Sequence, residues 1–125
     1  MPAEHWKDEP EEHDFPAAAD YLSLVFTPEE TAQLVDALRS AETAHRKAKD
    51  LLRAGRLPLL DSDDAHVKKD LAKVHDGKRL SPVLLVQGRA ADGVPLTVAD
   101  GYHRICASYH LDDDADVSCR LVRLP

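Results

Sequence analysis

The segment Val98-Ala99-Asp100-Gly101-Tyr102-His103-Arg104 places an Asp-Gly turn between a predicted strand and a predicted helix. The first amides of a helix have no partner within the helix, and the helix dipole makes that end positive. Gly101 leaves room for a ligand to approach these amides. His103 and Arg104 add two donors that can carry positive charge. The segment therefore predicts an anion site, and a phosphate suits it best.

The same residues also permit a purely structural role. Asp100 is a good helix N-cap, whose carboxylate would accept an amide of the first turn and satisfy that helix end. In that interpretation Gly101 only provides an unusual backbone angle, and Tyr102 packs as a half-buried aromatic side chain. Arg104 would then pair with the acidic loop at 112–116.

The residues on either side of the turn predict a small mixed sheet packed by helices, which is an α+β fold. Alternation of apolar runs, helical periodicity and turn residues defines the elements. They are, in order, a helix that begins near 61–64 and ends by Gly77, strands 82–86 and 94–98 joined as a hairpin by a turn at 91–93, a helix over 102–111, and a strand over 117–122.

A helical extension over residues 17–60 precedes this core, which spans 61–125, and together they predict one domain. Thr27-Pro28-Glu29-Glu30 has the pattern of a capping box with proline in the first turn, so a helix begins there. Apolar spacing continues to residue 54, either as one long helix or as two helices with a break near 40–43.

Residues 1–16 are rich in acidic side chains and contain three prolines, with no periodic apolar pattern. Such a composition is typical of a flexible or loosely docked tail. Trp6 and Phe15 are the side chains through which it would attach to the body.

Composition and charge limit the partners and the location. The formal net charge of −7 opposes nucleic acid, because binding to nucleic acid depends on lysines and arginines that neutralise phosphates. We therefore expect no specific DNA binding and a small charged ligand held in a pocket. The sequence has no apolar run close to the ~20 residues of a membrane span and no apolar stretch typical of a secretion signal. This predicts a cytoplasmic protein that does not enter membranes.

Between His66 and Val122 several weak signals follow one another in a specific order. A helix, a strand start with the pattern Gly…Leu-x-Pro-Val, a hairpin strand, an Asp-Gly turn that ends in His-Arg, a helix and a final strand together resemble the ParB N-terminal and sulfiredoxin superfamily. The form of the turn is most similar to the Asp-Gly-His-His-Arg turns of uncharacterised relatives. The matching residues are Gly77, Leu80, Pro82, Val83, Asp100, Gly101, His103, Arg104 and Ala107.

The resemblance implies that the turn binds the phosphates of a nucleotide such as ATP, ADP or CTP. It implies phosphate contacts from Gly101, His103 and Arg104 and a magnesium ion on Asp100. Independently of the resemblance, the aromatic ring of Tyr102 is a candidate to stack on a base. The chain departs from two branches of the superfamily. Tyr102 stands where sulfiredoxins carry a catalytic cysteine, and Tyr-His-Arg replaces the Glu-Arg-Arg of the chromosome-partitioning branch. We therefore expect neither sulfinic-acid reduction nor that branch's CTP switch.

The leading hypothesis is a domain that binds a nucleotide or another phosphate-bearing ligand at residues 100–104. A further hypothesis is that the domain also hydrolyses or transfers the phosphate, with Asp100 and His103 as the catalytic candidates. The further candidates for ligand contact, if their helices abut the turn, are Lys47, Lys49, His66 and Lys68. One alternative is a non-catalytic regulatory module that binds a protein partner or a second copy of itself. The other is a nuclease, which the sequence favours less because no cluster of metal-binding carboxylates is evident at the turn.

Overall fold

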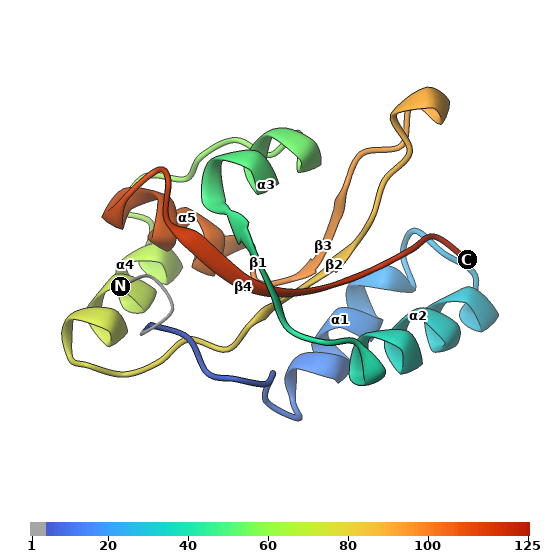
Figure 1. The fold of residues 1–125 in the computed structure, drawn as a ribbon, viewed down its shortest axis with the longest axis horizontal. Helices are drawn as coiled ribbons and strands as arrows, with labels where there is room; N and C mark the ends of the chain where they lie inside the picture. The colour runs from blue at the N-terminus through green and yellow to red at the C-terminus, as the bar shows by residue number, and fades with distance from the viewer. Residues whose placement is uncertain (1–4) are drawn as a thin grey trace.

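The computed structural model describes residues 5–125, which build a four-stranded mixed sheet with helices on both faces (Figure 1). This architecture, with helices at its N-terminal side, confirms the predicted α+β class. Within the described residues no helix is long and apolar enough to cross a lipid bilayer. The elements are α1 (Asp14–Leu22), α2 (Pro28–Ser40), β1 (Ala44–Lys47), α3 (Ala48–Gly55), α4 (Ala65–His75), β2 (Val83–Val86), the short 3-10 helix η2 (Ala90–Asp92), β3 (Thr97–Asp100), α5 (Tyr102–Leu111) and β4 (Asp116–Val122).

The strands lie in the order β1-β4-β2-β3. β4 pairs in parallel with β2 and antiparallel with β1, and β3 is antiparallel to β2. Every residue of β2 is buried, as expected of a central strand with a continuous apolar run. Every residue of β1 is exposed, as its position at the sheet edge and its polar sequence require.

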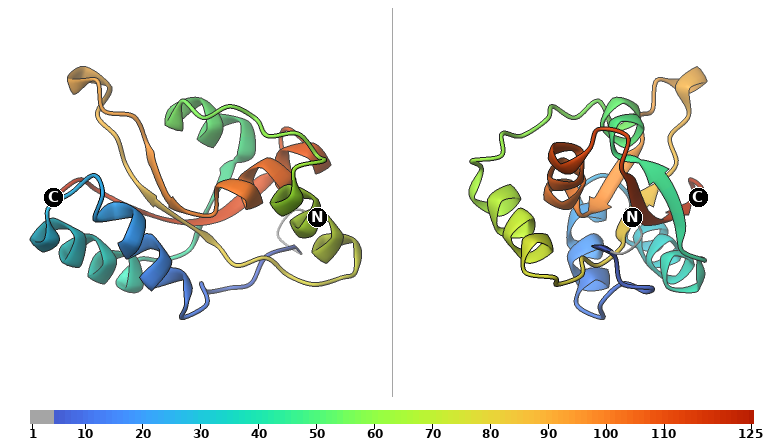
Figure 2. Two further views of the ribbon diagram at one scale, coloured as in Figure 1. Left: turned by 180° about the vertical axis from the view of Figure 1, so that it is seen from behind. Right: turned by 60° about the vertical axis from the view of Figure 1, so that its left-hand side comes forward.

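Alternation along β2 divides the core between the two faces of the sheet, because successive side chains of a strand point to opposite faces. Val83 and Leu85 belong to the cluster formed with α3, α4 and α5. Leu84 and Val86 belong to the cluster formed with α1 and α2. The sheet is therefore the middle layer between two helical layers, as the rotated views show (Figure 2).

The N-terminal segment packs on the body from residue 5 onward. Trp6 is only 3% exposed and lies in the first core cluster. The amide of Lys7 donates to the carbonyl of Leu80 at 2.8 Å, and the amide of Leu80 donates to His5 at 2.6 Å. Helix α1 begins at Asp14, inside the predicted tail. Residues 5–16 are thus part of the fold instead of a loosely docked tail; residues 1–4 of that prediction lie outside the described residues.

The predicted helix over 28–54 is interrupted. Thr27 caps α2 through the expected capping box, and the helix ends at Ser40, where the suggested break near 40–43 begins; β1 follows that break at Ala44–Lys47. The two-helix alternative is therefore correct, although the strand between the helices was not predicted. β1 pairs with β4, which lies about 70 residues further along the chain, and no local pattern reveals such a long-range partner.

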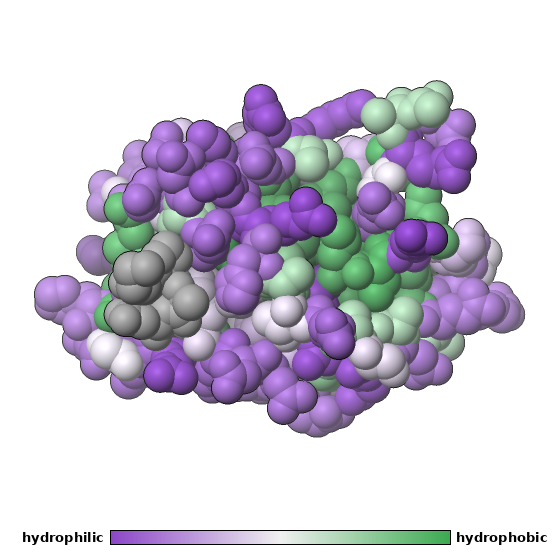
Figure 3. Space-filling model, in the orientation of Figure 1, coloured by the Kyte–Doolittle hydropathy of each residue, from purple (hydrophilic) through white to green (hydrophobic). Residues whose placement is uncertain are grey.

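The hairpin of β2 and β3 is confirmed, with a different boundary for its second strand. β3 covers Thr97–Asp100 rather than 94–98, because η2 and the bridge between Arg89 and Val94 close the tip of the hairpin. The amide of Leu96 donates instead to the carbonyl of Ala54, at the end of α3, at 2.9 Å. The hairpin tip projects from the body (Figure 1), and apolar side chains gather on the visible face between it and α3 (Figure 3).

Candidate functional site

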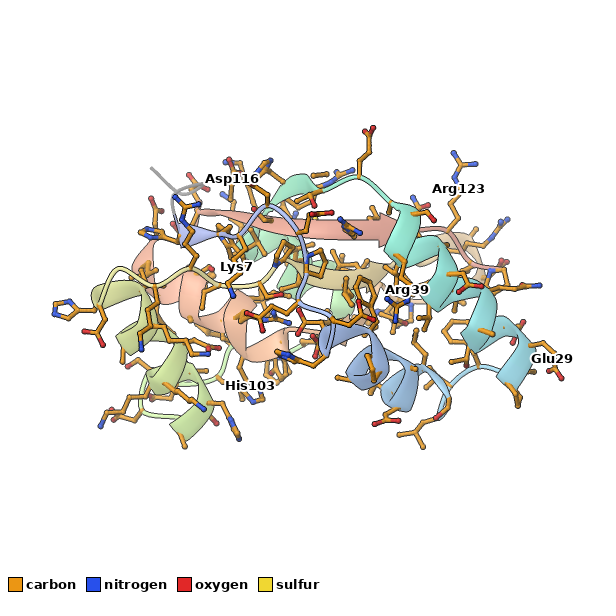
Figure 4. All side chains as sticks on the ribbon, turned by 90° about the horizontal axis from the view of Figure 1, so that it is seen from below. Lys7, Glu29, Arg39, His103, Asp116 and Arg123 are labelled. Atoms are coloured by element: carbon orange, nitrogen blue, oxygen red, sulfur yellow. The ribbon has the colours of Figure 1, made fainter. Side chains whose placement is uncertain are left out.

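A polar pocket of about 380 Å³ opens between α1, α4 and the start of α5. His103 lies in this region, between α4 and α1 in the view from below (Figure 4). Three basic side chains, three carboxylates and three histidines share the pocket walls. Its lining residues are His13, Asp14, Ala17, His66, Lys69, Asp70, Lys73, Asp100, Gly101, His103 and Arg104.

The N-terminal end of α5 is open, in the sense that no side chain of the described residues caps its first amides. Gly101 occupies the N-cap position with φ 111°. The expectation that Asp100 is the N-cap is therefore wrong, because Asp100 ends β3 and its carboxylate binds Arg104 instead. A Cβ atom on Gly101 would lie 2.4 Å from Cγ1 of Val83, so this turn requires glycine. The first amides of α5 are consequently available to a ligand in the pocket.

The guanidinium of Arg104 is held by the protein itself. Its Nη2 donates to Oδ2 of Asp100 at 2.7 Å, and its Nη1 donates to the carbonyl of Ser81 at 2.8 Å. Oδ2 of Asp14 lies 3.8 Å from Nη1, and the arginine side chain is 13% exposed. Arg104 therefore does not pair with the acidic loop at 112–116. It supplies positive charge from the wall of the pocket and fixes the turn.

Burial changes the proton affinity of the pocket carboxylates. It raises the pKa of Asp100, with a further contribution from the charge of Asp14, although the guanidinium of Arg104 acts in the opposite direction. Burial also raises the pKa of Asp70, despite the nearby charge of Lys73. Both groups therefore hold a proton more readily than exposed aspartates do.

Two histidines meet where two helices begin. His66 belongs to the first turn of α4 and His103 to the first turn of α5, and their ring centroids are 4.6 Å apart. Asp64 caps α4, since its Oδ1 accepts the amides of His66 at 3.0 Å and Val67 at 3.1 Å. The hydrogen bond from Val67 is the main cause of the lowered pKa of Asp64. The start of α4 is thus closed, whereas the start of α5 is open.

The structure brings together five of the residues that the sequence selected. All of them line the polar pocket: His66, Asp100, Gly101, His103 and Arg104. Their convergence depends on the contact between α4 and α5, two helices separated in the sequence by the β2–β3 hairpin.

The other four predicted residues lie elsewhere. The hydroxyl of Tyr102 donates to the carbonyl of Pro58, and its ring lines a separate groove. Lys49 pairs with the carboxylate of Asp114 at 2.6 Å, and Nζ of Lys47 donates to the carbonyl of the same residue at 3.5 Å. Lys68 is exposed on α4 and is absent from the pocket walls.

Sequence reasoning also missed residues that line the pocket. Lys69, Asp70 and Lys73 follow His66 at intervals of three and four, so they share one face of α4. That spacing was a usable signal once His66 had been selected. His13 and Asp14 offered no comparable signal, because α1 itself was not predicted.

Comparisons with protein-family models, with curated proteins and with solved structures found no match, so the resemblance to the ParB and sulfiredoxin superfamily remains a prediction from the sequence.

Proposed function

We propose that the polar pocket binds a phosphate-bearing ligand, either a nucleotide or another organic phosphate, with its phosphoryl oxygens at the start of α5. The observation that carries this proposal is the open first turn of α5, which borders a polar pocket whose lining includes Lys69 and Lys73. Free helix amides and the positive end of the helix dipole both favour an anion there.

Several groups have distinct parts in this proposal. The amides after Gly101 bind phosphoryl oxygens, and His103 donates a further hydrogen bond from its ring. Lys69 and Lys73 supply positive charge from α4. Arg104 and Asp100 act mainly on each other, so they hold the turn in its open form. This division differs from the sequence hypothesis, which gave Arg104 a direct hold on the phosphate.

Magnesium and catalysis stay predictions at this site. No group of three or more metal-binding side chains that could hold an ion occurs within residues 5–125. Magnesium usually takes one or two carboxylates together with substrate phosphates. Asp100 is the carboxylate nearest the open amides in the chain, and it would hold the ion only jointly with the ligand. His103 is the side chain placed to move a proton if a phosphate is hydrolysed or transferred.

The proposal is tested by thermal unfolding of the protein with ATP, ADP, CTP or pyrophosphate, each with and without magnesium. A ligand present at about 100 times its dissociation constant should stabilise the folded state by roughly 2.7 kcal/mol. We expect at least one of these compounds to raise the melting temperature. Release of inorganic phosphate, measured in the same samples, would show turnover.

Two neighbouring lysines provide a matched control. Both are exposed on α4, but Lys69 lines the pocket and Lys68 does not. Lys69→Ala should weaken the stabilisation, and Lys68→Ala should leave it unchanged. An absence of any shift at millimolar concentration of all four compounds would overturn the proposal and favour the protein-interaction alternative.

A further inference from the structure

A second cavity lies beside the polar pocket and has a different character. This apolar groove has a volume of about 760 Å³ and runs over β3, between the end of α1 and the end of α3. Aliphatic and aromatic side chains dominate its walls. Those that the argument uses are Tyr21, Val25, Leu57, Leu96, Val98 and Tyr102.

The groove and the polar pocket adjoin each other. They share Asp100, Gly101 and His103, so the turn that precedes α5 borders both of them. Helix α1 gives them a common wall, because Ala17 lines the pocket and Tyr21 lines the groove. Residues four apart lie on the same helix face, about 6 Å along the axis. The two adjoining hollows together make up a trough with a polar end, the pocket, and an apolar end, the groove.

We propose that the ligand of this trough is a phosphate ester with an apolar or aromatic body, whose phosphoryl group enters the polar pocket and whose body lies in the groove. This inference rests on the proposed function and adds the chemical class of the ligand. Inorganic phosphate or pyrophosphate would fill only the polar end and leave the groove to water. Binding sites for small molecules typically combine mostly apolar walls with a few placed polar groups.

The exposed parts of the groove give this inference its support. Tyr21 remains 45% exposed and Val25 remains 55% exposed, so these apolar side chains have surface that the protein leaves uncovered. An apolar body in the groove would remove that surface from water, which favours binding in proportion to the area covered. The aromatic rings of Tyr21 and Tyr102 also offer faces and edges to a planar body.

The experiment compares inorganic phosphate, phenyl phosphate and 1-naphthyl phosphate by calorimetric titration of the full chain. The phosphoryl group is the same in the three probes, whereas the body grows. We expect affinity to rise with the size of the body, at least tenfold from inorganic phosphate to 1-naphthyl phosphate.

Variants of the groove locate the effect. Tyr21→Ser and Val25→Asp change exposed side chains, and each should weaken 1-naphthyl phosphate about tenfold while inorganic phosphate binds as before. Leu24→Asp is the matched control, because Leu24 is 79% exposed and does not line the groove. It should leave all three affinities unchanged.

The possible failures are distinguishable. Equal affinity for the three probes would overturn the assignment of the groove and leave the phosphate site in place. Weakening of 1-naphthyl phosphate by Leu24→Asp as strong as by Val25→Asp would also overturn it, since a general charge effect would then explain the result. No binding of any phosphate compound, including the nucleotides, would overturn the proposed function together with this inference.

Discussion

Oδ2 of Asp100 lies 2.7 Å from Nη2 of Arg104, and this ion pair joins the end of β3 to the first turn of α5. The two residues are four apart in the sequence, yet they belong to different elements because Gly101 turns the chain between them. The pair leaves the amides of the turn uncapped and directs the guanidinium toward the protein.

Arg104→Ala is expected to lower the free energy of unfolding by about 2 kcal/mol at neutral pH. Removal of one partner from a largely buried pair leaves the other charge without compensation, and residual exposure of the pair moderates the cost. Arg104→Lys should lower the free energy of unfolding by less, because it keeps the positive charge. The cost that remains comes from the lost hydrogen bond to the Ser81 carbonyl. Urea denaturation followed by circular dichroism measures both. Equal losses for the two variants would show that the charge of Arg104 contributes nothing.

Asp100→Asn is expected to change how stability depends on pH. Because burial raises the pKa of Asp100 in the folded state, the folded protein holds this proton more tightly than the unfolded chain. The stability that Asp100 contributes through this shift is therefore fully present below about pH 3.9, the pKa of an unfolded aspartate. It is lost as the pH rises through the pKa of Asp100 in the folded state.

The measurement is the difference in unfolding free energy between the wild type and Asp100→Asn, taken from pH 3.5 to pH 7 in steps of roughly half a unit. As the pH rises, the wild type should lose stability relative to Asp100→Asn. A difference that moves in favour of the wild type would mean that Arg104 outweighs burial at Asp100.

Gly101→Ala and Gly77→Ala separate a steric requirement from a conformational one. Both glycines have positive φ, at 111° and 79°. A Cβ at residue 77 would meet no atom within 4 Å, so that substitution should cost about 1 kcal/mol of backbone strain alone. A Cβ at residue 101 would lie 2.4 Å from the Val83 side chain, and the total should be about 3 kcal/mol. Similar costs from denaturant unfolding would contradict the close contact at Gly101.

The sequence was most informative where structure depends on neighbours along the chain. The capping box at Thr27, the hairpin and the order from α4 to β4 all follow from local turn chemistry and apolar periodicity. β1 was missed because its four residues are polar and exposed, and it is a strand only through pairing with β4. Helix α1 was missed because the prolines and acidic residues before it resemble a tail, whereas tertiary packing of Phe15 and Leu22 stabilises it.

The same distinction applies to the candidate site. The open turn at Gly101 with His103 was found from local sequence, because the turn and the helix start are adjacent in the chain. The role of Asp100 was assigned wrongly, since capping and pairing with Arg104 are both compatible with its spacing and only the backbone path at Gly101 decides between them. The lysines of α4 and the residues of α1 reach the pocket through tertiary contacts that the sequence does not encode locally.

Trp6→Ala is expected to lower the free energy of unfolding by about 3 kcal/mol, which would establish the N-terminal segment as part of the fold. Trp6 is 3% exposed and packs in the cluster that includes α4 and α5, so truncation leaves a large cavity. Because Trp6 is the single tryptophan of the chain, its fluorescence is lost in the variant. Unfolding must therefore be followed by circular dichroism.

Two further variants interpret that result. Trp6→Phe should recover part of the loss, because a smaller aromatic ring still fills some of the same space. Leu24→Ala removes an apolar side chain that is 79% exposed, and a change within about 0.5 kcal/mol is expected for it. If Trp6→Ala costs no more than Leu24→Ala, residues 5–11 do not hold the N-terminal segment on the body. His13 and the buried Asp14 would then depend for their place in the pocket wall on α1 and on the contacts of Asp14 with Ser81 and Arg104.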